Sequence, residues 1–203
     1  SRRTSLAPEK SPDPYRFEIS LSVLNHLGRN LYRNFVTVLG EAISNSWDAN
    51  AKNVWIEIDR ENSSFSIKDD GDGMDSDDFQ GKFLKIGYSK RKAGGSKSST
   101  GRPYIGAKGI GKLALLSCAK RVSVFAKTSE TNYVGGVIDN AGLDGAILGD
   151  RSTEEYPLEQ LNFSLISELQ DGHEKGTIIY FEGTNDQLKN SDAYIKKLLA
   201  LSF

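Results

Sequence analysis

Glu41, Asn45 and Asp48 are spaced so that three polar side chains fall on one face of a helix. Positions i, i+4 and i+7 share one narrow stripe at 3.6 residues per turn. The neighbouring arc of the segment 31–46 is mostly apolar and ends with Ser46, so it would face a core. Two carboxylates and an amide, which can accept hydrogen bonds, would then line the edge of a buried helix. Taken alone, the stripe favours a merely solvated edge.

A second candidate is the segment 69–74, in which Asp69 ends a predicted strand and is followed by Gly71 and Gly73. Glycine lets the backbone turn sharply and approach a flat ligand, because it has no Cβ. The Asp69 carboxylate would then point at a hydrogen-bond donor. A calcium loop is excluded, because Met74 and Asp75 break its pattern of ligands and glycine. A plain Asp/Gly turn remains the alternative, and alone it is the stronger interpretation.

A third candidate is the glycine-rich segment 106–112, with the sequence GAKGIGK. It fits the spacing of a phosphate loop, but Leu113 stands where Ser or Thr is needed. It also fits a dinucleotide turn, but without the preceding strand. Anion binding is still physically favoured at this segment, because a glycine-rich turn that begins a helix presents N–H groups to an anion, and Lys108 and Lys112 add positive charge.

The net charge is only −1, which predicts no strongly charged partner for the chain as a whole, but the charges are unevenly distributed. Six aspartates lie within residues 69–78, and residues 79–129 contain twelve Lys and Arg but no acid. Residues 87–106 are rich in Gly, Ser and Lys and lack periodicity, which predicts a long lid or binding loop. The charge pattern is consistent with a metal-assisted polyphosphate site, a nucleic-acid surface or plain solvation.

The elements that must position these motifs follow from hydrophobic periodicity, in a chain whose 203 residues suit one α/β domain. Alternation predicts that 54–60 and 64–70 form an antiparallel hairpin. Residues 144–162 have no clear assignment. The other predicted elements are an edge strand at 16–20, helices at 23–28, 30–50, 76–86, 106–120 and 193–201, and strands at 121–127, 132–139, 163–170 and 176–183.

No apolar run approaches the ~20 residues of a membrane span, and the first residues lack the apolar region of a secretory signal. Cys118 is the single cysteine, so no intramolecular disulfide is possible. This fits a reducing compartment, the cytoplasm or a eukaryotic nucleus. The apolar surroundings of Cys118 predict a packed core thiol.

Read together and in order, these motifs resemble the GHKL superfamily of ATPases, which includes DNA gyrase B, the ninety-kilodalton heat-shock chaperones, sensor histidine kinases and MutL. The resemblance spans about residues 20–185. Glu41 points to the chaperone, MutL and Microrchidia-like branches, because histidine kinases lack this hydrolytic glutamate. Neither His26 nor His173 supplies a phosphoacceptor helix. The matching residues are Glu41, Asn45, Asp48 and Ala49; Asp69, Gly71, Gly73 and Met74; Gly106, Gly109 and Gly111; and Gly176 and Thr177.

The resemblance implies a Bergerat fold, a two-layer α/β sandwich of a mixed, largely antiparallel sheet and helices, with a long ATP lid. It implies that Asp69 accepts a hydrogen bond from adenine, Asn45 binds Mg²⁺ and Glu41 activates the attacking water. The residues that it places around the nucleotide are Asn45, Asp48, Ala49, Lys52, Asp69, Gly73, Met74, Gly106, Ala107, Lys108, Gly109, Ile110, Gly111, Lys112 and Thr177.

Two departures bear on activity. Tyr88 stands where the chaperones have a lysine at the start of the lid, and the γ-phosphate lysine of MutL- and gyrase-like enzymes comes from a second domain. We therefore expect a leader at 1–16 and an ATP-binding domain at 17–203 of a longer protein, with slow hydrolysis by this segment. ATP binding would close the lid and drive homodimerisation of the longer protein. We expect no membrane among its partners. The alternatives are a non-catalytic clamp that binds DNA through the basic residues 82–127 and a structural domain without a ligand.

Overall fold

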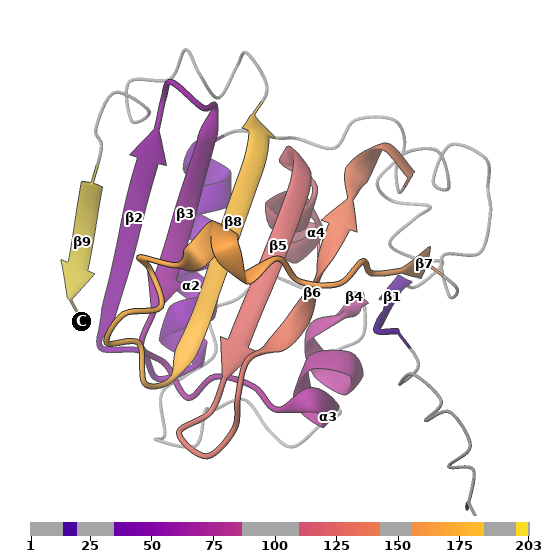
Figure 1. Cartoon of the computed structure of the whole chain (residues 1–203), viewed down its shortest axis with the longest axis horizontal. Helices are drawn as coiled ribbons and strands as arrows, with labels where there is room; N and C mark the ends of the chain where they lie inside the picture. Colours follow the sequence, from indigo (N-terminus) through magenta and orange to yellow (C-terminus); the bar gives the residue numbers. More distant parts are fainter. Residues whose placement is uncertain (1–13, 20–34, 87–109, 143–155, 185–197, 203) are drawn as a thin grey trace, which may run out of the picture.

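The computed structural model describes residues 14–19, 35–86, 110–142, 156–184 and 198–202. Their largest sheet has the order β6-β5-β8-β3-β2-β9, and each neighbouring pair is antiparallel. Helices α2 (Phe35–Asp48) and α4 (Ile110–Leu116) pack together on one face of it (Figure 1). This confirms the two-layer α/β prediction. The strands are β2 (Asn53–Asp59), β3 (Ser64–Asp69), β5 (Ala119–Lys127), β6 (Val134–Asp139), β8 (Gly176–Thr184) and β9 (Leu198–Ser202).

The main core lies between this sheet and the two helices. In β2, Val54, Ile56 and Ile58 are buried while the intervening side chains are more exposed, so the predicted alternation is confirmed. β2 pairs with β3 as the predicted hairpin. Cys118 is 2% exposed, in agreement with a core thiol. Val38 and Ala42 of α2 contribute to the same cluster, which positions that helix against the sheet.

A smaller sheet has the order β4-β1-β7, formed by β1 (Arg16–Ile19), β4 (Lys85–Ile86) and β7 (Tyr156–Pro157). β1 is its middle strand, parallel to β4 and antiparallel to β7, so the prediction of an edge strand is wrong. Tyr15, within the predicted leader, packs edge-on against Phe79 at 4.9 Å between ring centroids. The pairing partners of β1 are distant in sequence, and local pattern does not reveal them.

The predicted strand at 163–170 is also wrong, because its first residues form a 3₁₀ helix, η4 (Phe163–Ile166). The Asn162 side chain accepts a hydrogen bond from the Ser164 N–H, a local cap that favours a turn. Ile166 is fully buried in a cluster with Phe125 and Ile178. The η4 turn lies on the sheet face opposite α2 and α4 (Figure 1). The apolar residues of this segment therefore cover the second face of the sheet.

The predicted helix at 76–86 is shorter and irregular. It consists of α3 (Ser76–Asp78) and a π-helix, η1 (Phe79–Phe83), and the chain then enters β4. Phe79 and Leu84 are fully buried, and Phe83 is half-buried against the same core. Burial of Phe79 and Leu84 and pairing of β4 with β1 override a regular helix.

The predicted C-terminal helix at 193–201 is contradicted by β9, which pairs antiparallel with β2. An available sheet edge overrides the local helical pattern, because it satisfies the backbone groups of the strand. None of the described helices is both long and apolar enough to cross a membrane. Four predicted segments lie wholly or partly outside the described residues: the helix at 23–28, the lid at 87–106, most of the leader and the first part of 144–162.

Candidate functional site

Helix α2 ends in a Schellman motif that directs the chain into β2. The N–H of Ala51 donates to the Ser46 carbonyl at 2.9 Å, and the N–H of Asn50 donates to the Trp47 carbonyl at 3.0 Å. Asn50 has a φ of 61°, the left-handed conformation that asparagine tolerates at this position. The predicted end of the helix near Asn50 is therefore confirmed.

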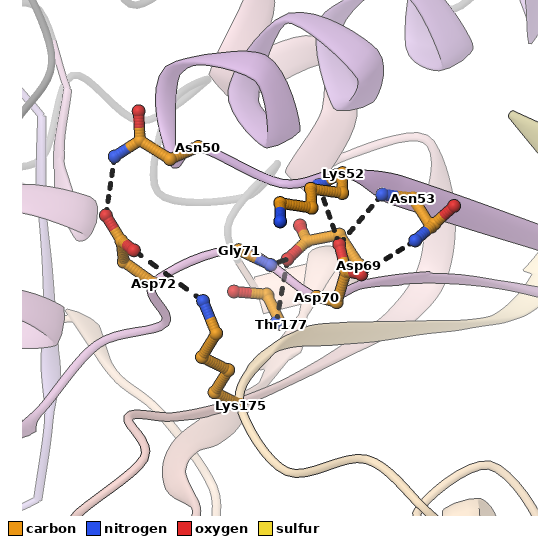
Figure 2. A network of polar contacts seen from close by, with 9 residues as sticks. All are labelled: Asn50, Lys52, Asn53, Asp69, Asp70, Gly71, Asp72, Lys175 and Thr177. Atoms are coloured by element: carbon orange, nitrogen blue, oxygen red, sulfur yellow. Dashed lines mark hydrogen bonds and ion pairs between the residues drawn. The ribbon is translucent and has the colours of Figure 1, made fainter. Parts of the chain in front are cut away.

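The turn after β3 is fastened to this helix end (Figure 2). The Asp70 carboxylate accepts the N–H groups of Lys52 and Asn53, both at 2.8 Å, and the Asn53 side-chain amide at 2.9 Å. The Asp72 N–H donates to the Ala49 carbonyl at 2.8 Å. Partial burial opposes ionisation of Asp70, but these hydrogen bonds outweigh it and hold the pKa of Asp70 below its ordinary value.

The Asp69 carboxylate is buried and held in one orientation. Its Oδ1 accepts the N–H groups of Gly71 at 2.9 Å and Thr177 at 3.2 Å (Figure 2), and its Oδ2 accepts the Ser46 hydroxyl at 2.9 Å. Burial raises the pKa of Asp69, although all three hydrogen bonds act in the opposite direction. A carboxylate has about four acceptor positions. Asp69 therefore keeps capacity to accept a further donor.

The glycines of this turn allow close approach of the protein's own backbone. A Cβ on Gly73, whose φ is +71°, would lie 1.7 Å from the Lys127 carbonyl oxygen. A Cβ on Gly71 would lie 2.8 Å from the Ala49 oxygen. We expected these glycines to admit a ligand, but at Gly73 the neighbouring strand and the positive φ already require glycine.

The polar stripe on α2 faces the start of α4. Glu41 is only 8% exposed, and a Cβ on Gly111 would lie 2.2 Å from its Oε2 atom. Asn45, one turn further along α2, is half-buried, and its Nδ2 atom has no hydrogen-bond partner among the described residues. Rotation of the amide exchanges its nitrogen and oxygen. The side chain therefore fits a ligand for a hard cation, which prefers oxygen.

The other predicted site residues are divided between this region and neighbouring elements. Asp48 is half-buried, Lys52 is exposed, and Met74 packs against the main core. The Lys112 ammonium lies 3.3 Å from the Phe83 carbonyl oxygen and 5.0 Å from the ring centroid, so it is directed toward η1. Residues 106–109 and the Ile110 side chain lie outside the described part of the chain.

Most of the clustered aspartates have local partners. Asp75 caps α3 by accepting the Asp78 N–H at 2.8 Å, and Asp78 forms an ion pair with Lys82 at 3.1 Å. Asp72 contacts Asn50 and Lys175 (Figure 2). Within the described ranges, no group of three or more His, Cys, Asp or Glu residues is arranged to hold a metal ion. This cluster therefore forms caps and turns in the described structure.

Two residues at this site escaped the sequence interpretation. Ser46, assigned to the core-facing arc, is 1% exposed and donates to Asp69. A hydroxyl on a buried arc needs a partner, and this signal could have identified it. His173, considered only as a phosphoacceptor, has its Nε2 atom 2.7 Å from the Asp69 carbonyl oxygen. No local pattern connects residues so distant in sequence.

Two comparisons with known proteins place the chain in a family. A protein of Herpetosiphon aurantiacus named "Putative type II restriction enzyme HgiDII" is 30% identical over 196 residues, which cover 95% of this chain. The chain spans 30% of the length of that relative. The family described as histidine kinase-, DNA gyrase B- and HSP90-like ATPases matches residues 32–140, which include α2, the Asp69 turn and α4. This chain therefore belongs to the family of histidine kinase-, DNA gyrase B- and HSP90-like ATPases.

Proposed function

We propose that the chain is an ATP-binding and slowly hydrolysing module of a longer protein, and that the nucleotide lies between α2, the Asp69 turn and the start of α4. The observation that carries this proposal is the Asp69 carboxylate, which is buried, fixed by three donors and still able to accept another. An adenine amino group is a donor of the required kind, and family membership supports this choice.

Each residue of the α2 stripe has a separate role in the proposed reaction. The Asn45 amide oxygen would hold Mg²⁺, which when bound supplies positive charge to the phosphates. Glu41 would take a proton from water as the water oxygen bonds to the γ-phosphorus and the bond from that phosphorus to ADP breaks. The packing of Gly111 against the Glu41 carboxylate would keep this base in one position.

Calorimetric titration with ATP and a non-hydrolysable analogue, with and without Mg²⁺, tests the site. Asp69→Asn should weaken binding of both nucleotides, because asparagine replaces one carboxylate acceptor with a donor. Asp77→Asn is the matched control, because Asp77 belongs to the same acidic segment but is exposed. Equal affinities in wild type and Asp69→Asn would refute the proposed role of Asp69.

The α2 stripe is tested by separating binding from turnover. Glu41→Ala should abolish ATP hydrolysis and leave ATP binding, whereas Asn45→Ala should remove the Mg²⁺-dependent gain in affinity. Unchanged hydrolysis in Glu41→Ala would exclude Glu41 as the base. An unchanged Mg²⁺ effect in Asn45→Ala would exclude Asn45 as a ligand.

We further propose that bound ATP orders the segment 87–106 as a lid and promotes homodimerisation of the longer protein. Family membership and the lack of periodicity in that segment support this extension. Light scattering of the longer protein, with the non-hydrolysable analogue and with ADP, should give a larger mass with the analogue. The same mass in both states would contradict nucleotide-gated association.

A second candidate function is DNA binding through the basic residues 82–127. The Herpetosiphon aurantiacus relative, named "Putative type II restriction enzyme HgiDII", favours a DNA context for the longer protein. Phosphate contacts by this segment would make DNA affinity fall steeply with salt. Fluorescence anisotropy with duplex DNA between low and physiological salt tests this candidate, and the absence of binding at low salt would remove it.

A further inference from the structure

The β3–β8 ladder changes its hydrogen-bonding pattern at Asp69. The pairing runs from Ser64 opposite Glu182 to Lys68 opposite Ile178, and the same register would place Asp69 opposite Thr177. At that position the Thr177 N–H donates to the Asp69 side chain at 3.2 Å. The carboxylate therefore takes the donor that a continuing ladder would give to the backbone carbonyl.

The Asp69 carbonyl consequently needs another donor, and His173 supplies it. The carbonyl oxygen lies 2.7 Å from His173 Nε2, and His173 is 6% exposed. A carbonyl can only accept, so the Nε2 atom must carry the proton. A Cβ on Gly176 would lie 2.1 Å from the same oxygen, which shows how closely the start of β8 surrounds it.

Tyr133 completes the arrangement on the other side of the ring. Its hydroxyl oxygen lies 2.7 Å from His173 Nδ1. In the neutral ring, Nδ1 is an acceptor when Nε2 carries the proton, so Tyr133 donates to it. The Tyr133 hydroxyl therefore satisfies the acceptor nitrogen of the tautomer that the Asp69 carbonyl requires.

The surroundings of this ring favour its neutral form. Burial lowers the pKa of His173, and the positive charges of Lys68 and Lys127 act in the same direction. The hydrogen bond to the Asp69 carbonyl and the negative charge of Asp70 oppose this shift. The Lys127 ammonium also lies 4.8 Å from the Tyr133 ring centroid.

We propose that His173 is a positioning residue for base recognition: with its Nδ1 atom satisfied by Tyr133, it donates from Nε2 to the Asp69 carbonyl and leaves the Thr177 N–H to orient the Asp69 carboxylate. This inference rests on the proposed ATP site. Without His173, the Asp69 carbonyl competes for the Thr177 N–H and the carboxylate loses one of the three groups that hold it.

Binding of ATP and GTP to the 203-residue chain tests this role. His173→Leu removes the donor and should lower the ratio of ATP to GTP affinity by about tenfold, the value of one well-placed hydrogen bond to a charged group. His173→Gln keeps an N–H donor on a side chain of similar length and should restore most of the ratio. Equal loss for both nucleotides, or no recovery in His173→Gln, would overturn the proposal.

Tyr133→Phe keeps the aromatic ring and should lower the ATP/GTP ratio by a smaller factor than His173→Leu. Tyr180→Phe is the matched control, because Tyr180 packs on the same sheet face but hydrogen-bonds Ser64 instead. A ratio that falls equally in both tyrosine variants would overturn the role of Tyr133.

Imidazole ¹⁵N NMR gives a readout that does not depend on nucleotide. The wild type should show a neutral His173 ring with the proton on Nε2, and a proton on Nδ1 alone would overturn the inference. Failure of the wild type to bind ATP would refute the proposed function and leave this tautomer test intact. ATP binding that is unchanged in His173→Leu would refute only the role of His173.

Discussion

Substitution of Gly111 by alanine should reduce ATP turnover because it displaces the proposed base. The added Cβ would lie 2.2 Å from Glu41 Oε2 and 2.7 Å from Glu41 Cδ. An ordinary contact begins at 3.4 Å, so the carboxylate must move by about 1.2 Å, the difference between 3.4 and 2.2 Å. A misplacement of about 1 Å in a catalytic group can cost about 100-fold in rate. We therefore expect kcat to fall about 100-fold.

A coupled-enzyme ATPase assay with a parallel calorimetric titration measures both effects. Gly40→Ala is the matched control, because nothing lies within 4 Å of its added Cβ next to Glu41 on α2. That change should keep wild-type turnover and stabilise the helix by up to about 1 kcal/mol. Helix propensity also favours alanine at 111, so it does not explain a loss there.

A double-mutant cycle with Glu41→Ala separates two roles of Gly111. If the added methyl group acts through the Glu41 carboxylate, Gly111→Ala should have no further effect on the residual turnover of Glu41→Ala. Wild-type turnover in the single Gly111→Ala variant would refute the reasoning. An equal loss of turnover with and without Glu41 would refute it as well.

Three further predictions concern the residues around Asp69. Gly73→Ala should destabilise the fold by at least about 2 kcal/mol, because a left-handed φ and a 1.7 Å approach to the Lys127 carbonyl oxygen both oppose a Cβ. Chemical denaturation of Gly172→Ala measures the cost of a left-handed φ alone, since a Cβ there meets nothing within 4 Å. Equal losses of stability in the two variants would contradict the clash at Gly73. Ser46→Ala should cost about 1 kcal/mol of stability and weaken ATP binding by removing one donor to Asp69, and unchanged ATP affinity in a titration would exclude Ser46 from the site. The pKa of His173 is lower in the folded than in the unfolded chain, so on acidification the unfolded chain takes up this proton first. The contribution of the neutral His173 ring to stability is therefore present above the ordinary histidine pKa and is lost as the pH falls through the folded pKa. Urea midpoints of His173→Gln should change less over this pH range than those of the wild type.

Local sequence pattern was a reliable guide where the physical cause is local. The alternation in β2 and β3 follows from one face of each strand packing into the core, and the end of α2 follows from the conformation that Asn50 accepts. The sequence was a poor guide for 163–170 and 193–201. The first forms a turn of 3₁₀ helix over a sheet face, and the second ends in a strand whose partner, β2, lies far earlier in the chain.

The sequence by itself was enough to identify the family, through a resemblance carried by the spacing of Glu41, Asn45 and Asp48 and of Asp69, Gly71 and Gly73. Only the tertiary structure revealed the hydrogen bonds of Ser46 and His173 to Asp69 and the packing of Gly111 on Glu41. The physical reason is that a buried polar group takes whatever partner the fold brings within about 3 Å. Sequence separation does not limit that choice, so no local spacing records it.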